Sequence, residues 1–287
     1  MSTERIGVLY PGEMGISIAV AAQKSGNDVY WASEGRSVQT RERAAKFGLR
    51  DAETLAKLCA ACEIIVSVCP PHAAEDVAQR VLAHGFTGVY LDANAISPQR
   101  AVSIGEVMAK AGATFVDGGI IGGPAWTPGT TWLYLAGPCA DRVAACFAAG
   151  PLETRVLGKT IGKASALKMC YAAYSKGTTA LLCAALAAAE HLGVRPELQE
   201  QWAHDEREGA EKKGARRLRS LPDKAWRFAG EMEEIAATFR AAGVPEGFHT
   251  AAEQLYRRLA HFKDAPAPPA LEDVLAALLQ PEDTPSA

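Results

Sequence analysis

The chain has 287 residues, of which 48% are apolar and 22% are charged, and its formal net charge is −3. This length and composition predict one large or two moderate folded domains and exclude disorder and a collagen-like chain. The nearly balanced charge provides no general field that would attract nucleic acid or an anionic membrane, so we expect neither as a partner.

The first residues lack a basic segment followed by a long apolar run, so we expect no export signal. The longest uncharged helical stretch, 177–189, is shorter than the roughly 20 residues that span a bilayer, and it predicts a buried helix. The 7 cysteines are an odd number and lie mostly in apolar segments, which indicates reduced thiols and a cytoplasmic location. Cys59 and Cys62 have the spacing of a metal or redox pair, but no second pair lies nearby, so no metal is expected.

Up to residue 160, short β-rich runs alternate with helical stretches, which predicts an α/β domain of the Rossmann type, a doubly wound and mostly parallel sheet. Strands are expected at 5–10, 28–32, 63–68, 88–92, 114–117, 131–136 and 154–157, and helices at 14–25, 40–47, 52–60, 73–83 and 98–111.

From residue 161 the pattern becomes all-helical and alanine-rich, beginning with a long helix at 163–192, and charge becomes dense beyond Arg195. We assign 161–264 to a substrate and dimerisation domain. Residues 265–287 are predicted to be a Pro-rich linker, a short helix at 270–279 and a frayed tail.

A glycine-containing loop follows the first expected strand, with the sequence Tyr10-Pro-Gly-Glu-Met-Gly15. It matches the dinucleotide fingerprint G-x-G-x-x-G in part, because Tyr10 replaces the first glycine. Pro11 and Gly12 suit the centre of a type II turn, with positive φ at the glycine. Gly12 would let backbone N–H groups approach a pyrophosphate at the helix N-terminus, and Gly15 would let the helix lie close to the strand. The alternative is a plain strand-to-helix turn.

The choice of cofactor depends on the end of the second strand, where Ser33, Glu34, Arg36 and Ser37 stand. Glu34 could accept hydrogen bonds from the ribose hydroxyls of NAD. Arg36 between two serines suits the 2′-phosphate of NADP, because guanidinium binds phosphate in a bidentate manner. We favour NADP, with NAD and a solvated Glu34–Arg36 pair as alternatives.

Four segments in order resemble the β-hydroxyacid dehydrogenase superfamily, which includes 6-phosphogluconate and 3-hydroxyisobutyrate dehydrogenases and the imine reductases. They are Gly12-Glu-Met-Gly15, Leu91-Asp-Ala-Asn-Ala-Ile-Ser-Pro98, Asp117-Gly-Gly-Ile-Ile-Gly-Gly-Pro124 and Gly162-Lys-Ala-Ser-Ala-Leu-Lys168. The second half, at 225–245 and 251–259, is similar to the helical C-terminal domain of an uncharacterised branch labelled 6-phosphogluconate dehydrogenase-like. The resemblance implies an NAD(P)-dependent oxidoreductase that acts on a small alcohol or carbonyl substrate and pairs into a homodimer.

The resemblance also assigns residues to the site. Lys168 falls on the family lysine, a general acid/base that exchanges a proton with the alcohol, and Lys176 is the second choice. The substrate loop falls on Ile121, Gly122 and Gly123. The residues expected to bind the cofactor are Tyr10, Pro11, Gly12, Glu13, Met14, Gly15, Ser33, Arg36, Ser37, Cys69, Pro70 and Asn94.

Two positions depart from the family pattern. Ala172 stands where an asparagine is usual, and Ile121 stands where the loop has serine. We therefore expect a less polar substrate, with Tyr171 or Tyr174 as another proton donor and substrate contact. An apolar pocket could be lined by Ile120, Ile121, Trp126, Tyr171 and Tyr174, although each could equally be plain core. An imine reductase, or a non-catalytic NADP-binding sensor, remains the alternative function.

Overall fold

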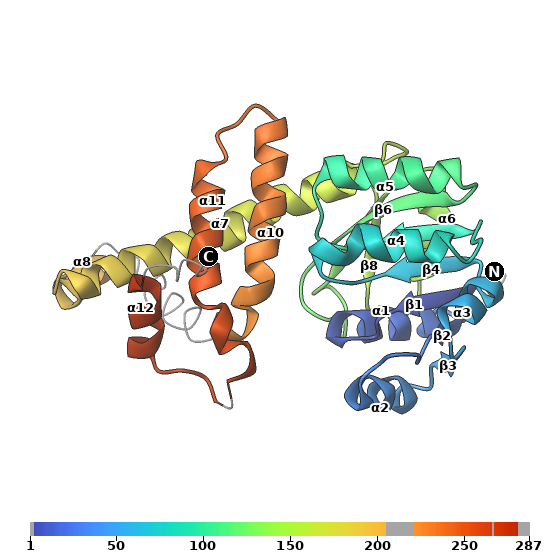
Figure 1. Cartoon of the computed structure of the whole chain (residues 1–287), viewed down its shortest axis with the longest axis horizontal. Coiled ribbons are helices and arrows are strands. Elements are labelled where there is room, and N and C mark those ends of the chain that lie inside the picture. The colour runs from blue at the N-terminus through green and yellow to red at the C-terminus, as the bar shows by residue number, and fades with distance from the viewer. Residues whose placement is uncertain (1–2, 205–220, 266, 281–287) are drawn as a thin grey trace, which may run out of the picture. The chain divides into compact units, whose positions relative to one another are not determined.

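The computed structural model describes residues 3–204, 221–265 and 267–280, and the chain divides into two compact units, residues 1–169 and 170–287. The fold class predicted from the sequence is confirmed, because a mostly parallel, Rossmann-like sheet with helices is followed by a helical region (Figure 1). The predicted tail, 281–287, and most of the charge-dense stretch, 205–220, lie outside the described residues.

The first unit is built on a sheet of eight strands in the order β3-β2-β1-β4-β5-β6-β7-β8. All neighbouring strands are parallel except β6 and β7, which are antiparallel. The loops that follow β1, β2, β4 and β5 therefore gather at one edge, where such sheets bind ligands. The strands are β1 (Arg5–Leu9), β2 (Asp28–Trp31), β3 (Arg50–Asp51), β4 (Ile64–Ser67), β5 (Val89–Asp92), β6 (Thr114–Ile121), β7 (Trp132–Ala136) and β8 (Glu153–Val156).

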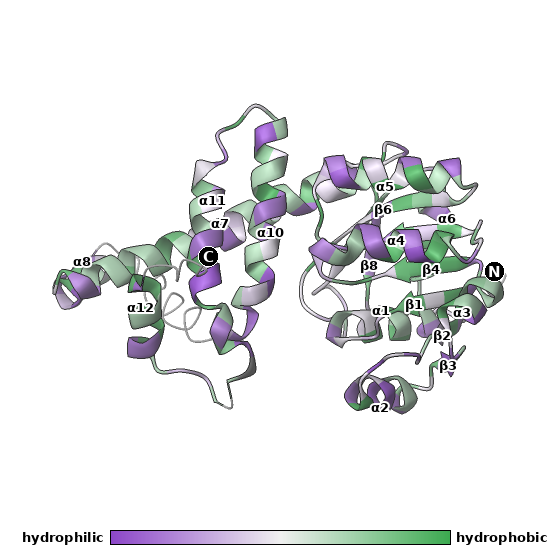
Figure 2. Cartoon of the chain, in the orientation of Figure 1, coloured by the Kyte–Doolittle hydropathy of each residue, from purple (hydrophilic) through white to green (hydrophobic). Residues whose placement is uncertain are grey.

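Helices cover both faces of this sheet. Successive residues of a strand point to opposite faces, so Val8 and Val66 belong to one buried cluster and Leu9 and Ile65 to the other. Figure 2 shows β4 in the green of hydrophobic residues, as expected for a strand buried on both sides. The first cluster is covered by α1 (Glu13–Lys24), α2 (Val38–Lys46) and α6 (Ala140–Ala145), and the second by α3 (Leu55–Ala61), α4 (Ala74–Leu82) and α5 (Pro98–Lys110).

Several boundaries differ from the prediction for local reasons. The helix expected from residue 52 begins at Leu55, because the Thr54 hydroxyl caps it by accepting the Lys57 N–H at 3.3 Å. β6 continues beyond its expected end at Asp117, because β7 pairs with it as far as Ile121. The short elements β3 and α6, together with a 3₁₀ turn at Pro71–Ala73, were not predicted.

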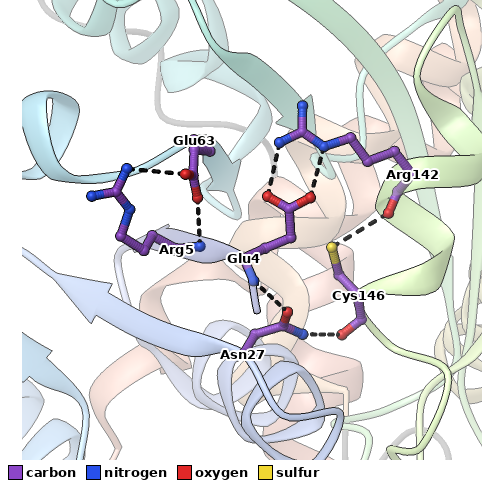
Figure 3. A network of polar contacts seen from close by, with 6 residues as sticks. All are labelled: Glu4, Arg5, Asn27, Glu63, Arg142 and Cys146. Carbon is purple, nitrogen blue, oxygen red and sulfur yellow. Dashed lines mark hydrogen bonds and ion pairs between the residues drawn. The ribbon is translucent and has the colours of Figure 1, made fainter. Parts of the chain in front are cut away.

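A polar network lies at the amino end of β1, at the sheet edge opposite the loops that follow β1, β2, β4 and β5 (Figure 3). Both carboxylate oxygens of Glu4 accept from the guanidinium of Arg142, each at 2.8 Å. The Arg5 backbone N–H and guanidinium donate to Glu63 at 2.8 and 3.0 Å. Asn27 accepts the Glu4 N–H at 3.1 Å and donates to the Cys146 carbonyl at 2.9 Å. These bonds join β1 to the residues just before β2 and β4 and to α6 and its C-cap.

The second unit is helical. Its helices α10 and α11 bury Met232, Ile235 and Tyr256, and the Tyr256 hydroxyl donates to the Lys176 carbonyl at 2.6 Å. Of the helices that the structure describes, none is long and apolar enough to cross a membrane. The helices are α7 (Lys163–His191), which starts in the first unit, α8 (Arg195–His204), α10 (Pro222–Ala241), α11 (Gly247–Arg258) and α12 (Leu271–Leu279), with a 3₁₀ helix at Ala260–Asp264.

Candidate active site

The loop between β1 and α1 reverses at Tyr10 and not at Gly12. Tyr10 has a φ of 64°, whereas Gly12 has a φ of −68°. The predicted type II turn with positive φ at Gly12 is therefore wrong. Gly12 is the N-cap of α1 and takes an extended conformation, so the left-handed residue comes earlier in the chain. The Gly12 N–H closes the turn by donating to the Tyr10 carbonyl at 2.7 Å.

The two glycines of this loop play different parts. A Cβ at Gly15 would lie 2.6 Å from the Tyr10 carbonyl oxygen, so only glycine lets α1 lie this close to the loop. A Cβ at Gly12 would meet that oxygen only at 3.9 Å, and Gly12 therefore borders open space. Within the described chain, no side chain caps α1 at Gly12. The free N–H groups of the first helical turn, at Glu13 and Met14, suit an anion such as a pyrophosphate.

Arg36 lies in the turn after β2, with its guanidinium stacked over the Tyr10 ring. The distance from Arg36 Cζ to the ring centre is 4.1 Å. No carboxylate in the described part of the chain forms an ion pair with Arg36. Glu34 is exposed, and its backbone N–H donates to the Glu53 carbonyl at 2.8 Å.

The two serines that flank Arg36 are held by the protein itself. Ser33 is only 7% exposed, and its N–H donates to an Asp51 carboxylate oxygen at 3.2 Å. The Ser37 hydroxyl accepts the Thr40 N–H at 3.3 Å and so caps α2. Ser37 is exposed, and its hydroxyl can therefore also contact a ligand.

Asn94, after β5, clamps the loop that follows β4. Its side-chain oxygen accepts the Cys69 N–H at 2.5 Å, and its amide nitrogen donates to Ser67 Oγ at 3.2 Å. Because Asn94 is 3% exposed and both ends of its amide are engaged, its contribution is to hold Cys69 and Pro70 at the sheet edge. Burial raises the pKa of the Cys69 thiol to about 12, which leaves it a neutral thiol at physiological pH.

Asp92 lies beneath this clamp at the end of β5. One of its carboxylate oxygens accepts the Asn94 N–H at 2.9 Å, while the other has no hydrogen-bond partner among the described residues. Asp92 is 1% exposed, and burial raises its pKa to about 7.

Asp117 of β6 binds the amino-terminal turn of α7, the helix that carries Lys168. Its carboxylate accepts N–H groups of Gly162 and Ala164 at 2.8 and 2.9 Å, and the Ser165 hydroxyl at 2.6 Å. Burial raises the pKa of Asp117, and these hydrogen bonds oppose that rise. Two of the motifs, Asp117–Pro124 and Gly162–Lys168, are therefore bonded directly to each other.

Lys168 lies over Gly119 of β6. A Cβ added at Gly119 would come 2.6 Å from the Ala164 carbonyl oxygen and 3.2 Å from Lys168 Cβ. The absence of a side chain at Gly119 thus lets α7 approach β6 and places Lys168, which is half-buried, beside the strand that runs on to Ile121.

The loop beyond β6 makes its turn at Gly122, which has a φ of 124°. A Cβ added at Gly122 would clash with the Thr130 carbonyl oxygen, whereas a Cβ added at Gly123 would meet no atom within 4 Å. Ile120 is buried and Ile121 half-buried. The last residue of the predicted pocket in this unit, Trp126, stacks on Phe47 with ring centres 5.3 Å apart.

Trp126 and Phe47 line a hollow of about 530 Å³ on the face of α1 and α2. Four charged side chains share it, two acidic and two basic. The lining residues are Glu13, Ile16, Gln39, Glu42, Arg43, Lys46, Phe47, Pro124 and Trp126.

The remaining predicted residues belong to α7 within the second unit. Tyr171 and Tyr174 are exposed, by 53% and 79%. Lys176, the second choice for the acid/base, pairs with Glu231 at 2.7 Å and lies 4.8 Å from the Phe228 ring centre. That pairing gives Lys176 a structural role. Among the described residues, no cluster of histidine, cysteine, aspartate or glutamate side chains could hold a metal ion.

Asp117, Ser165 and Asp92 shape this site but were not predicted as site residues. Two signals were present. Asp117 opens the motif that carries Gly118 and Gly119, and Ser165 stands one helical turn before Lys168. Asp92 gave a weaker signal, an acid at the end of an apolar strand.

Two family models match separate parts of the chain. Residues 5–146 match the NAD binding domain of 6-phosphogluconate dehydrogenase, and residues 189–259 match a domain of unknown function, DUF1932. A curated relative, an uncharacterised 28.5 kDa protein of Methanothermus fervidus, is 29% identical over 68% of this chain and 75% of its own.

Three solved structures share the fold. A conserved protein of unknown function, described as structurally similar to 3-hydroxyacid dehydrogenases, is 27% identical with a TM-score of 0.67, over 96% of this chain and 100% of its own. A 3-hydroxyisobutyrate dehydrogenase from Salmonella typhimurium is 16% identical with a TM-score of 0.66, over 95% and 99%. A reductive aminase from Aspergillus terreus, solved with NADPH and ethyl levulinate, is 18% identical with a TM-score of 0.58, over 96% and 99%.

Proposed function

Because the chain joins an NAD-binding domain of the 6-phosphogluconate dehydrogenase family to a DUF1932 domain, we propose that it is an NADP-dependent oxidoreductase of the β-hydroxyacid dehydrogenase type. Its substrate is a small alcohol/carbonyl pair, and Lys168 is the general acid/base. The observation that carries the proposal is the placement of Lys168 over Gly119, fixed by the bonds from Asp117 to the first turn of α7.

The edge of the sheet fits a dinucleotide. Gly12 borders open space at the uncapped N-terminus of α1, where backbone N–H groups favour a pyrophosphate. The exposed hydroxyl of Ser37 and the guanidinium of Arg36, which has no carboxylate partner in the described chain, favour the 2′-phosphate that distinguishes NADP from NAD.

A bound nicotinamide would supply or accept the hydride that the substrate carbon gains or loses. Lys168 gives or takes the proton at the substrate oxygen, a step that typically contributes about 100-fold or more to the rate. Gly123, where an added Cβ would meet nothing within 4 Å, leaves open space in the loop beyond β6 for a substrate. Ile121, which stands where the family loop has serine, favours a substrate less polar than a sugar phosphate.

The test is turnover by Lys168→Met, with Lys163→Met, an exposed lysine one turn earlier on α7, as the matched control. We expect Lys168→Met to lower the rate of alcohol oxidation about 100-fold or more while NADPH still binds. Lys163→Met should retain the wild-type rate. Unchanged turnover in Lys168→Met would remove Lys168 from the proposed role.

Imine reduction is the second candidate, because Ile121 also suits an apolar imine and the fold is shared with a reductive aminase. A panel of ketones with and without an amine, followed by NADPH absorbance, separates the two. Reduction that requires the amine and survives Lys168→Met would favour an imine reductase. NADPH binding without turnover of any substrate would favour a sensor.

We also propose that the protein acts in the cytoplasm as a homodimer in which residues 161–264 provide the substrate and dimerisation domain. The apolar exposed residues of α7, which include Tyr174 and Leu181, support the dimer. The seven free cysteines support the reducing compartment.

A further inference from the structure

Tyr10 occupies a backbone conformation that rarely suits a side chain. Its φ of 64° lies in the left-handed region, which costs a residue other than glycine on the order of 1 kcal/mol or more. The conformation is fixed from both sides: the Gly12 N–H holds the Tyr10 carbonyl at 2.7 Å, and Gly15 packs against that carbonyl. Glycine would meet these backbone demands more easily than tyrosine.

The side chain of Tyr10 forms a fixed platform at the sheet edge. Its ring is half-buried and packs against the buried cluster that contains Leu9 and Ile65. The guanidinium of Arg36 lies over the ring at 4.1 Å, and no carboxylate in the described ranges pairs with it. Arg36 is thus held by an aromatic face, which leaves the N–H groups at the rim of its plane available to a ligand.

We propose that Tyr10 is a positioning residue that holds Arg36 for the 2′-phosphate of NADP and thereby sets the preference for NADP over NAD. The inference rests on the proposed function. A guanidinium binds phosphate through two parallel N–H bonds in its own plane, so a ring against its face does not compete with the phosphate. Stacking also removes the rotamer freedom that Arg36 would otherwise lose on binding.

The experiment measures the dissociation constants of NADPH and NADH by protein fluorescence, together with the melting temperature of each variant. Tyr10→Phe keeps the ring, and Tyr10→Leu keeps apolar bulk without it. Arg36→Leu and the double variant Tyr10→Leu/Arg36→Leu complete a double-mutant cycle. Tyr10→Met replaces Tyr10→Leu in the cycle if the latter does not fold.

We expect Arg36→Leu to weaken NADPH binding about 10- to 100-fold, as for a lost hydrogen bond to a charged group, and to leave NADH binding within about twofold. Tyr10→Leu should weaken NADPH binding about two- to fivefold, as for a lost exposed cation–π contact, again without changing NADH. Tyr10→Phe should match the wild type. In the double variant, the loss of Tyr10 should cost nothing beyond the loss of Arg36.

Equal weakening of NADPH and NADH in Tyr10→Leu would overturn the inference, because it would show that Tyr10 only supports the loop. So would a Tyr10→Phe variant that behaves like Tyr10→Leu, or additive effects in the cycle. If the wild-type protein binds neither dinucleotide, the proposed function fails and the inference falls with it. If it binds NADPH and Tyr10→Leu keeps the same preference, only the inference is overturned.

Discussion

Asp92 is a carboxyl group at the carboxyl end of β5, and the fold favours its neutral form more than the unfolded chain does. Burial raises its pKa to about 7, whereas an unfolded chain has an ordinary aspartate pKa near 3.9. Between these two pH values, the folded protein binds a proton that the unfolded protein does not. Asp92 therefore lowers the free energy of unfolding as pH rises from about 4 to about 7.

We predict that Asp92→Asn removes this part of the pH dependence. The variant should gain stability relative to the wild type on going from pH 5 to pH 8, by an amount on the order of a few kcal/mol. Urea unfolding at both pH values measures it, with Asp76→Asn, an exposed acid on α4, as the control. The same pH dependence in the wild type and Asp92→Asn would contradict the assignment.

Individual side chains were only partly predictable. The sequence predicts Gly12, Gly15 and Arg36 as cofactor-binding residues, because glycine spacing and the distance to the next strand end are local patterns. It could not show that Tyr10 takes the left-handed conformation or that its ring lies under Arg36, because that contact joins two loops across the sheet edge.

At the scale of elements, the close approach of α7 to β6 determines where Lys168 lies. We predict that Gly119→Ala destabilises the protein by about 1–3 kcal/mol and lowers turnover, because its Cβ would lie 2.6 Å from the Ala164 carbonyl oxygen and displace α7. Urea unfolding and activity measure the two effects. Gly123→Ala, where a Cβ meets nothing within 4 Å, is the control for stability. A wild-type midpoint in Gly119→Ala would show that α7 is not held against β6.

The elements themselves were largely predictable, because apolar alternation and helical periodicity are properties of short segments. β4 and α7, for example, lie within a residue or two of their expected bounds. The extension of β6 through Gly118 and Gly119 was not predictable. Glycine is unfavourable in strands, and the strand continues there because β7 pairs with it. The bonds from Asp117 to α7 span more than 40 residues of sequence and have no local signature.

For the whole molecule, the proposed homodimer makes a prediction about mass. Tyr174 and Leu181 lie on one face of α7 and are 79% and 58% exposed, an apolar surface that a second copy would cover. Light scattering should give about twice the chain mass of 30.3 kDa. Leu181→Glu should shift the protein towards the monomer, whereas Gln254→Glu, an exposed change on α11, should not. A wild-type mass of 30.3 kDa would contradict the dimer.

The bonds between Asp117 and the start of α7 also bear on how the molecule can be divided experimentally. A fragment that ends at residue 160, the boundary expected from the sequence, would keep Asp117 but lose the donors from Gly162, Ala164 and Ser165. The Asp117 carboxylate would then lack those partners, which lowers the free energy of unfolding by about 1–3 kcal/mol for each charged hydrogen bond lost. A fragment that ends after Met169 retains every donor, and truncation there is the sounder design for isolating the dinucleotide-binding unit.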